Sequence, residues 1–336
     1  MARLVAAFAS SHSVMLTSTL EDWQNGFVER DPDGQYFDRN GDPCTYQDLL
    51  GVAPPDAAAL VSEAAITARF NEVQAAMAHM REAIAAARLD ALIICGDDQH
   101  ELFKDTAMAP IAIYYGPTIR NAARKPVDDW FRHAQMQRLE VDRDAHYPCH
   151  VPLAAHLIEG LGELDFDITT MGGLTDGAYE GHAFSFIHRT YLGGVDLPVV
   201  PVFMNTFYPP NPPRPKRCLA FGRALRELID SYPGDLRVGI IASGGLSHFQ
   251  AEEDLDRPII DAISRKDLDF IGALNVRRLQ AGSSEIRNWI VVAAAADDFD
   301  LDWVSYTPAY RTPALTGTGL GFAVWKPAAG SVPLPD

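Results

Sequence analysis

Short apolar runs alternate with stretches of helical pattern along most of this 336-residue chain, and this alternation limits the possible folds more than any other feature. Each apolar run is bounded by polar or glycine-rich residues, which is typical of buried strands. The clearest runs lie at residues 4–8, 91–95, 197–203 and 237–242. Strands that alternate with helices predict an α/β fold, in which helices flank a central, mostly parallel sheet.

The longest helical pattern covers residues 57–88, where apolar side chains recur at helical spacing with room for one break. Further helices are expected at residues 151–161, 217–232, 256–280 and 284–297, and further strands at 111–115, 166–169, 304–307 and 319–325. Residues 117–147 are polar and mixed, and their pattern predicts no element.

No internal repeat and no low-complexity linker divides the chain, so residues 1–336 are predicted to form a single domain. Residues 18–60 are the exception to the alternating pattern. They are polar, aromatic and rich in Asp, Gly and Pro, which predicts a surface excursion or a lid.

A formal net charge of −17 argues against nucleic acid or an anionic membrane as the main partner. It does not argue against an anionic small molecule, because salt screens distant charges within about 10 Å. The four cysteines show no paired spacing, which predicts reduced thiols in a cytoplasmic protein. The apolar run near the N-terminus is interpreted as the first strand rather than as a signal peptide.

Three histidines follow directly after predicted strands: His12 in VAAFASSHS, His100 in LIICGDDQH and His248 in GIIASGGLSH. In open α/β sheets, sites assemble beyond the carboxyl ends of the strands. A single histidine in such a place is usually a hydrogen-bonded loop residue. The repetition of the pattern favours a shared site.

Two further segments carry candidate residues. Glu285 in AGSSEIRNW stands at a predicted helix start, where it is either a capping acid or a ligand. His182 lies in the glycine-rich segment GLTDGAYEGHAF, which suggests a loop entering a cavity. Two histidines and one carboxylate on one face of Fe(II) leave coordination positions open for substrate and O2.

The ordered set of SSH, strand-D-x-H, strand-GGLSH and GSSE resembles the class III (LigB-type) extradiol ring-cleaving dioxygenases. This family includes the protocatechuate 4,5-dioxygenase catalytic subunit and single-chain gallate and 3-O-methylgallate dioxygenases. The run from VVPVFMNTFYPPNPPRPKRC to GGLSH is especially similar. The resemblance covers residues 2–325, with a poor match at 19–60.

The resemblance implies a single LigB-like domain with Fe(II) as cofactor and with His12, His100 and Glu285 as its ligands. It also implies an acid/base role for His248 and a second active-site histidine at His182. The family's ligand directly follows Asp, whereas here Asp98 is followed by Gln99 and then His100. Gln99 and Glu101 therefore remain alternatives to His100.

The implied reaction inserts both atoms of O2 to open the ring of a catechol-type aromatic acid in aromatic catabolism. Protocatechuate, gallate, 3-O-methylgallate and lignin-derived catechols all remain open as substrates. The segment RTPALTGTGLG offers Arg311, Thr316 and Thr318 for the substrate carboxylate, or it forms a turn before the last strand. Aromatic residues of the excursion either close over the ring or pack on the surface: Trp23, Tyr36 and Phe37.

Two alternatives belong to other classes. A zinc-dependent hydrolase or zinc dioxygenase relative would accept the same His and Glu ligands with a water at the open position. A non-catalytic accessory subunit would have no need of four such residues together. The resemblance further suggests a homodimer and leaves a separate small subunit open.

Overall fold

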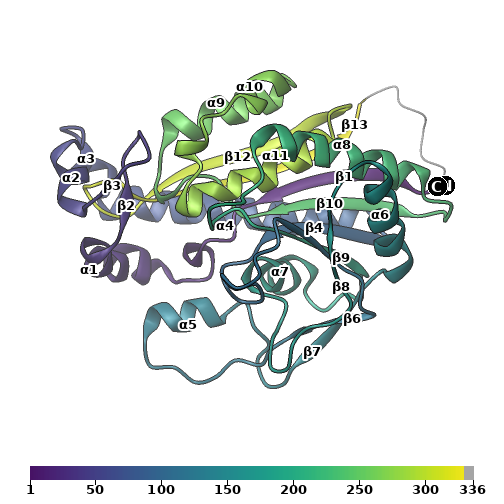
Figure 1. Cartoon of the computed structure of the whole chain (residues 1–336). Helices are drawn as coiled ribbons and strands as arrows, with labels where there is room; N and C mark the ends of the chain where they lie inside the picture. Colours follow the sequence, from purple (N-terminus) through teal and green to yellow (C-terminus); the bar gives the residue numbers. More distant parts are fainter. Residues whose placement is uncertain (329–336) are drawn as a thin grey trace.

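The computed structural model describes residues 1–328, and a nine-stranded sheet forms its centre. The strand order is β11-β13-β1-β10-β4-β9-β5-β8, with β12 paired to β13 (Figure 1). The neighbours β1, β10, β4 and β9 are parallel to one another, which confirms the predicted α/β class. The strands are β1 (Arg3–Ser10), β4 (Ala91–Asp97), β5 (Ile111–Tyr114), β8 (Thr169–Met171), β9 (Val199–Met204), β10 (Arg237–Ser243), β11 (His248–Gln250), β12 (Phe299–Tyr310) and β13 (Thr316–Pro327).

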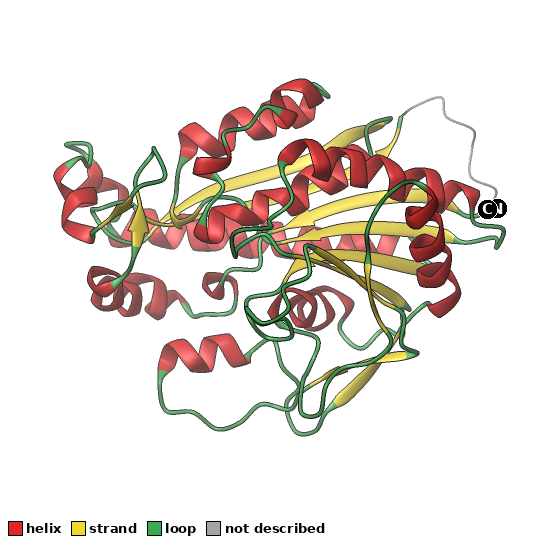
Figure 2. Ribbon diagram, viewed as in Figure 1, coloured by secondary structure: helices red, strands yellow, loops and turns green. Residues whose placement is uncertain are grey.

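Helices cover both faces of the sheet, as Figure 2 shows. Because successive side chains of a strand point to opposite faces, Ala7 and Ile93 enter one hydrophobic cluster while Phe8 and Ile94 enter the other. The first cluster is completed by α6 (Val151–Glu163), α8 (Pro215–Ser231), α9 (Glu253–Ser264) and α11 (Ile286–Ala295). The second is completed by α4 (Glu63–Ala86) and α7 (His182–Ile187).

The predicted helix over 57–88 is confirmed with its single break. It consists of α3 (Ala57–Leu60) and α4, and the hydroxyl of Ser62 caps α4 by accepting a hydrogen bond from the backbone of Ala65. The predicted helix over 256–280 is instead three pieces: α9, α10 (Leu268–Gly272) and the short η5 (Val276–Arg278). The Asp267 side chain starts α10 as a new helix by accepting from the backbone of Phe270.

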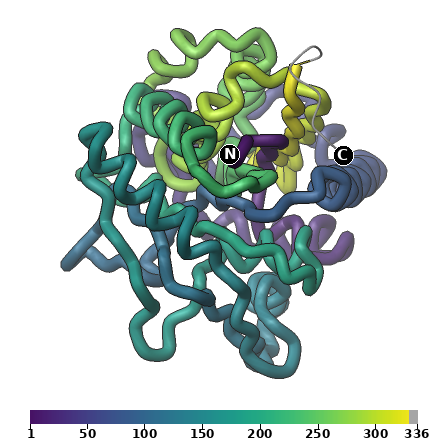
Figure 3. Tube along the Cα trace, turned by 90° about the vertical axis from the view of Figure 1, so that its right-hand side faces the viewer, coloured from purple at the N-terminus to yellow at the C-terminus, as the bar shows by residue number. Residues whose placement is uncertain are grey.

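Two segments whose sequence predicted no helix or strand contain short helices and strands in the structure. Residues 117–147 form β6 (Thr118–Asn121), α5 (Trp130–Met136) and β7 (Ala145–Pro148), on the opposite side of the molecule from α9 and α10 (Figures 1 and 3). The excursion holds α1 (Phe27–Arg30), β2 (Tyr36–Phe37), β3 (Pro43–Cys44) and α2 (Tyr46–Gly51). Between residues 1 and 328, no helix has the length and apolar character that crossing a membrane requires.

Candidate active site

The candidate site begins where three parallel strands end. β1 ends at Ser10, β10 at Ser243 and β4 at Asp97, and β10 lies between the other two. Ser10 pairs with Ser243 in register, so the residues that follow these strands leave the sheet at one edge. His12 and Asp97 therefore meet although 85 positions of sequence separate their numbers.

Four buried or half-buried side chains gather at this edge: His12, Asp97, His182 and Glu285, with their ligand-type atoms all within 4.8 Å of one another. Nε2 of His12 lies 3.3 Å from Oε2 of Glu285 and 3.8 Å from Oδ1 of Asp97. Nε2 of His182 lies 3.7 Å from the other Asp97 oxygen. We call these four residues the His/carboxylate cluster.

Glu285 enters the cluster from the end of η6 (Ala281–Glu285), directly before α11. The backbone N–H of Gly245 donates to its Oε2 at 2.8 Å. Burial raises the pKa of Glu285, but the charges of His12, His248 and His182 outweigh burial and hold it at about 2. A side chain at Gly244 would place its Cβ 2.6 Å from this same oxygen, so only glycine permits the approach.

His182 is the first residue of α7, and Glu101 fixes its orientation. Nδ1 of His182 lies 2.7 Å from Oε2 of Glu101, and the backbone N–H of His182 donates to Oε1 at 2.8 Å. Burial lowers the pKa of His182, but Glu101 and Asp97 raise it to about 9. With Nδ1 engaged, Nε2 is the atom that faces the cluster.

His248 lies beside the cluster and not within it. Its Nδ1 is 3.0 Å from the carbonyl oxygen of Leu246, and its backbone N–H donates to the Ser283 hydroxyl. Burial lowers the pKa of His248 from its ordinary value. Since Nδ1 is the donor to a carbonyl, Nε2 carries the free lone pair that a general base needs.

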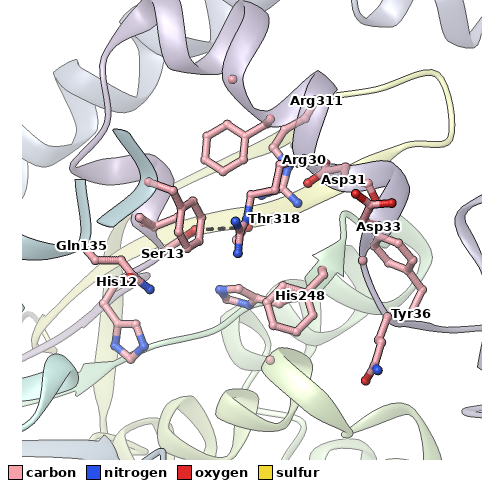
Figure 4. A pocket seen from close by; sticks show the side chains of 18 of the residues that line it. His12, Ser13, Arg30, Asp31, Asp33, Tyr36, Gln135, His248, Arg311 and Thr318 are labelled. Carbon is pink, nitrogen blue, oxygen red and sulfur yellow. Dashed lines mark hydrogen bonds and ion pairs between the residues drawn. The ribbon is translucent and has the colours of Figure 1, made fainter. Parts of the chain in front are cut away.

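A cavity of about 670 Å³ opens onto these residues (Figure 4). Its inner wall includes His12, His182, His248 and Glu285, and its outer wall comes from the excursion and from α5. The volume is within the range of sites that bind small organic molecules.

The structure does not bring His100 into the cluster. His100 has φ +63, and its imidazole stacks on Tyr208 with ring centroids 3.6 Å apart, while Nε2 lies 3.0 Å from exposed Asp105. The side chain that approaches from this turn is Gln99, whose Nε2 lies 3.1 Å from Asp97 and 3.2 Å from Glu285. Glu101, the other alternative, contacts His182 instead.

The expected carboxylate-binding residues have different environments. Nε of Arg311 donates to Oδ2 of Asp31 at 2.8 Å, and the buried Thr316 hydroxyl donates to the same oxygen. Thr316 therefore stabilises an internal ion pair and does not line the cavity. Thr318 and Arg311 do line it, and the Thr318 hydroxyl lies 3.3 Å from that of Ser13.

The excursion is packed more deeply than its composition predicts. Trp23 is buried, its indole N–H donates to the carbonyl of Met15, and its ring meets Phe70 edge to face. Trp23 therefore packs in the interior and does not close over a ligand, and Phe37 does not line the cavity either. Tyr36 lines the cavity and donates its hydroxyl to the carbonyl of Asp31.

Asp97 is the cluster residue that sequence reasoning did not single out. Its signal was present, because it is the first acid of the strand-terminal GDDQH segment.

The cluster fits a divalent metal ion. Oδ1 of Asp97 is buried and has no hydrogen-bond partner among residues 1–328. An unpartnered buried carboxylate oxygen is costly, so a cation beside it would stabilise it. Imidazole and carboxylate are both ligands that iron accepts.

A protein-family model matches most of the chain. The family model described as the catalytic LigB subunit of aromatic ring-opening dioxygenase matches residues 63–321. The chain belongs to this LigB family. The LigB match contains three of the four cluster residues, whereas His12 and the excursion precede it.

Among curated proteins, the chain is similar to members of named dioxygenase groups. It is 35% identical over 101 residues to the gallate dioxygenase of Pseudomonas putida, covering 30% of this chain and 28% of that protein. It is 28% identical over 179 residues to the 2,3-dihydroxyphenylpropionate/2,3-dihydroxicinnamic acid 1,2-dioxygenase of Mycobacterium ulcerans, covering 53% and 50%. The counterpart from Comamonas testosteroni is 35% identical over 99 residues, or 29% of each chain. The matched segments thus span half or less of these relatives.

Proposed function

We propose that this LigB-family chain is a non-haem Fe(II)-dependent extradiol dioxygenase that opens the ring of a catechol-type aromatic acid. The observation that carries the proposal is the His/carboxylate cluster at the strand ends, open to a cavity with His248 on its wall. The names of the similar proteins, which act on gallate and on dihydroxyphenylpropionate, support the same substrate class.

His12, Asp97 and Glu285 would hold the iron. Their imidazole and carboxylate atoms are of the types that ferrous iron accepts, and three protein ligands would leave positions on the metal open for substrate and O2. Asp97 takes the place that the resemblance implied for His100, because Asp97 lies in the cluster and His100 does not. Bound at this site, ferrous iron supplies the centre through which electrons pass from catechol to O2.

Two histidines of the chain would carry out the proton transfers. His248 accepts the proton of a catechol hydroxyl at Nε2, since Nδ1 is engaged by the carbonyl of Leu246. His182 presents Nε2 to the cluster and can return a proton while Glu101 holds its Nδ1. The walls of the cavity orient the ring.

The test is anaerobic reconstitution with ferrous iron, followed by O2 uptake with protocatechuate, gallate, 3-O-methylgallate, 2,3-dihydroxyphenylpropionate and unsubstituted catechol. Rapid uptake, loss of the aromatic absorbance and a yellow ring-opened product are expected with at least one of the acids. The zinc-loaded protein serves as control and should consume no O2. Lack of uptake by protein that holds one iron per chain would contradict the proposal.

The homodimer and the cytoplasmic location expected from sequence stay predictions, which sedimentation and cell fractionation would test.

A further inference from the structure

One guanidinium at the cavity lacks an anionic partner. Arg30 ends α1 and lines the cavity, and no side-chain hydrogen bond or ion pair joins it to another residue of the part of the chain that the structure describes. Its guanidinium carbon lies 3.8 Å from the ring centroid of Phe131. Stacking on an aromatic face fixes a guanidinium while its N–H groups, which point outward in the plane, stay available to a ligand.

The other two arginines at this cavity are already engaged. Arg311 is paired with Asp31 at 2.8 Å, so its charge is neutralised within the protein. Arg138 lies 3.8 Å from Glu101, which also holds His182. A carboxylate ligand would therefore compete with an internal anion at either of them, and it meets no such competition at Arg30.

Arg30 faces the reacting side of the cavity. Figure 4 shows its guanidinium in the same open space as Thr318 and the imidazole of His248. Glu29 and Asp33 also line the cavity, but neither forms an ion pair with Arg30. In a chain with a net charge of −17, this cation supplies the local attraction that an anionic ligand requires.

We infer that Arg30 binds the carboxylate of the aromatic substrate through a forked pair of N–H···O hydrogen bonds, with the catechol end toward His248; this inference rests on the proposed function. Arginine matches carboxylate geometry in two parallel hydrogen bonds. The cavity of about 670 Å³ also admits acids whose carboxylate is carried on a side chain of the ring. Arg30 precedes the segment that the LigB family model matches, so this anchor belongs to the chain's own excursion.

The experiment compares two probes of one shape, 3,4-dihydroxybenzoate and its uncharged amide, by isothermal titration under anaerobic conditions. Arg30→Met keeps the length of the side chain and removes its charge. Arg39→Met is the matched control, since Arg39 is exposed, does not line the cavity and lies 3.8 Å from Asp254. Circular dichroism melting establishes that each variant is folded.

Wild type should bind the carboxylate more tightly than the amide. Arg30→Met should weaken carboxylate binding about 10- to 100-fold, with the amide unchanged, and Arg39→Met should match wild type. Equal loss of both probes, carboxylate binding unchanged in Arg30→Met, or no carboxylate preference in wild type would overturn the inference. A selective loss of carboxylate binding in Arg138→Met, and not in Arg30→Met, would also overturn the inference.

The titration separates this inference from the proposed function. Selective loss of the carboxylate in Arg30→Met, without O2 uptake by the iron-loaded wild type, would uphold the Arg30 site and reject the dioxygenase. Uptake by wild type, with the same KM for the acid in Arg30→Met, would uphold the dioxygenase and reject the Arg30 site.

Discussion

Oε2 of Glu101 lies 2.7 Å from Nδ1 of His182, and Oε1 of the same carboxylate accepts the backbone N–H of His182. One acid thus fixes both the ring and the start of α7. Such carboxylate–histidine pairs set which nitrogen of the ring faces the reacting centre.

Removing this acid should impair turnover more than iron binding. Glu101→Ala is expected to lower kcat about 10- to 100-fold, because His182 loses its orientation. Glu101→Gln keeps an acceptor and should retain more activity. Steady-state kinetics together with iron content per chain will measure this. An iron content that falls in parallel with kcat would assign Glu101 to holding the metal site instead.

Substitution of Asp97 should weaken iron binding. Asp97→Asn keeps the shape and removes the charge of a proposed ligand, and we expect a loss of at least about 10-fold in ferrous affinity. His100→Ala is the control, because His100 contacts Tyr208 and Asp105 away from the cluster. Competition with a metal-binding dye gives both affinities. Unchanged affinity in Asp97→Asn, with a loss in His100→Ala, would restore His100 to the ligand set.

His248 should be needed for turnover and not for iron. His248→Phe removes the proposed base, and kcat should fall by about 100- to 10,000-fold while one iron per chain remains. Stopped-flow O2 consumption and metal analysis measure the two properties separately. A variant that keeps most of its rate would remove His248 from the acid/base role.

Gly244 should tolerate no side chain. Alanine at this position would bring its Cβ to 2.6 Å from Oε2 of Glu285 and 3.1 Å from Cε1 of His12, at φ +118. We expect Gly244→Ala to lose iron and to melt at lower temperature. Gly177→Ala is a matched control, since Gly177 also has positive φ (+79) but has open space around it. Equal effects of the two substitutions would attribute the loss to backbone strain rather than to the clash.

Buried Asp256 should make stability depend on pH. Burial raises its pKa to about 7, although hydrogen bonds from Ser247 and Tyr306 lower it. In the unfolded chain this carboxyl titrates near 3.8. Its contribution to the free energy of unfolding is therefore complete below about pH 4 and is lost as the pH rises toward 7, by at most about 1.4 kcal/mol per pH unit.

Asp256→Asn removes this titration. Urea unfolding between pH 4.5 and 8 should show a difference between wild type and variant that changes up to about pH 7 and is constant above it. A difference that is constant over the whole range would show that Asp256 titrates normally.

Much of the fold could be predicted from the pattern of apolar and polar residues in the sequence. Apolar runs and helical periodicity predicted the strands and helices that build the sheet and its two covers, because burial on the faces of a sheet requires those patterns. The polar residues after the strands placed His12 and His248 near one edge, and the resemblance to the LigB-type dioxygenases added Glu285. The break in the helix at 256–280 was not predicted, since a capping side chain such as Asp267 competes with a continuous periodicity.

The tertiary structure decided which neighbouring side chains face the site. Within GDDQH, the turn after β4 directs Asp97 and Gln99 to the cluster and His100 to Tyr208, and residue order alone does not reveal this turn conformation. It also decided which arginine is free. Asp31 pairs with Arg311 across 280 positions of sequence, and this pairing leaves Arg30, its neighbour in the chain, open to the cavity. The sequence by itself determined the strands and the chemistry available at their ends, because local patterns encode burial. Orientation and charge pairing depend on contacts between distant segments, which form only when the chain has folded.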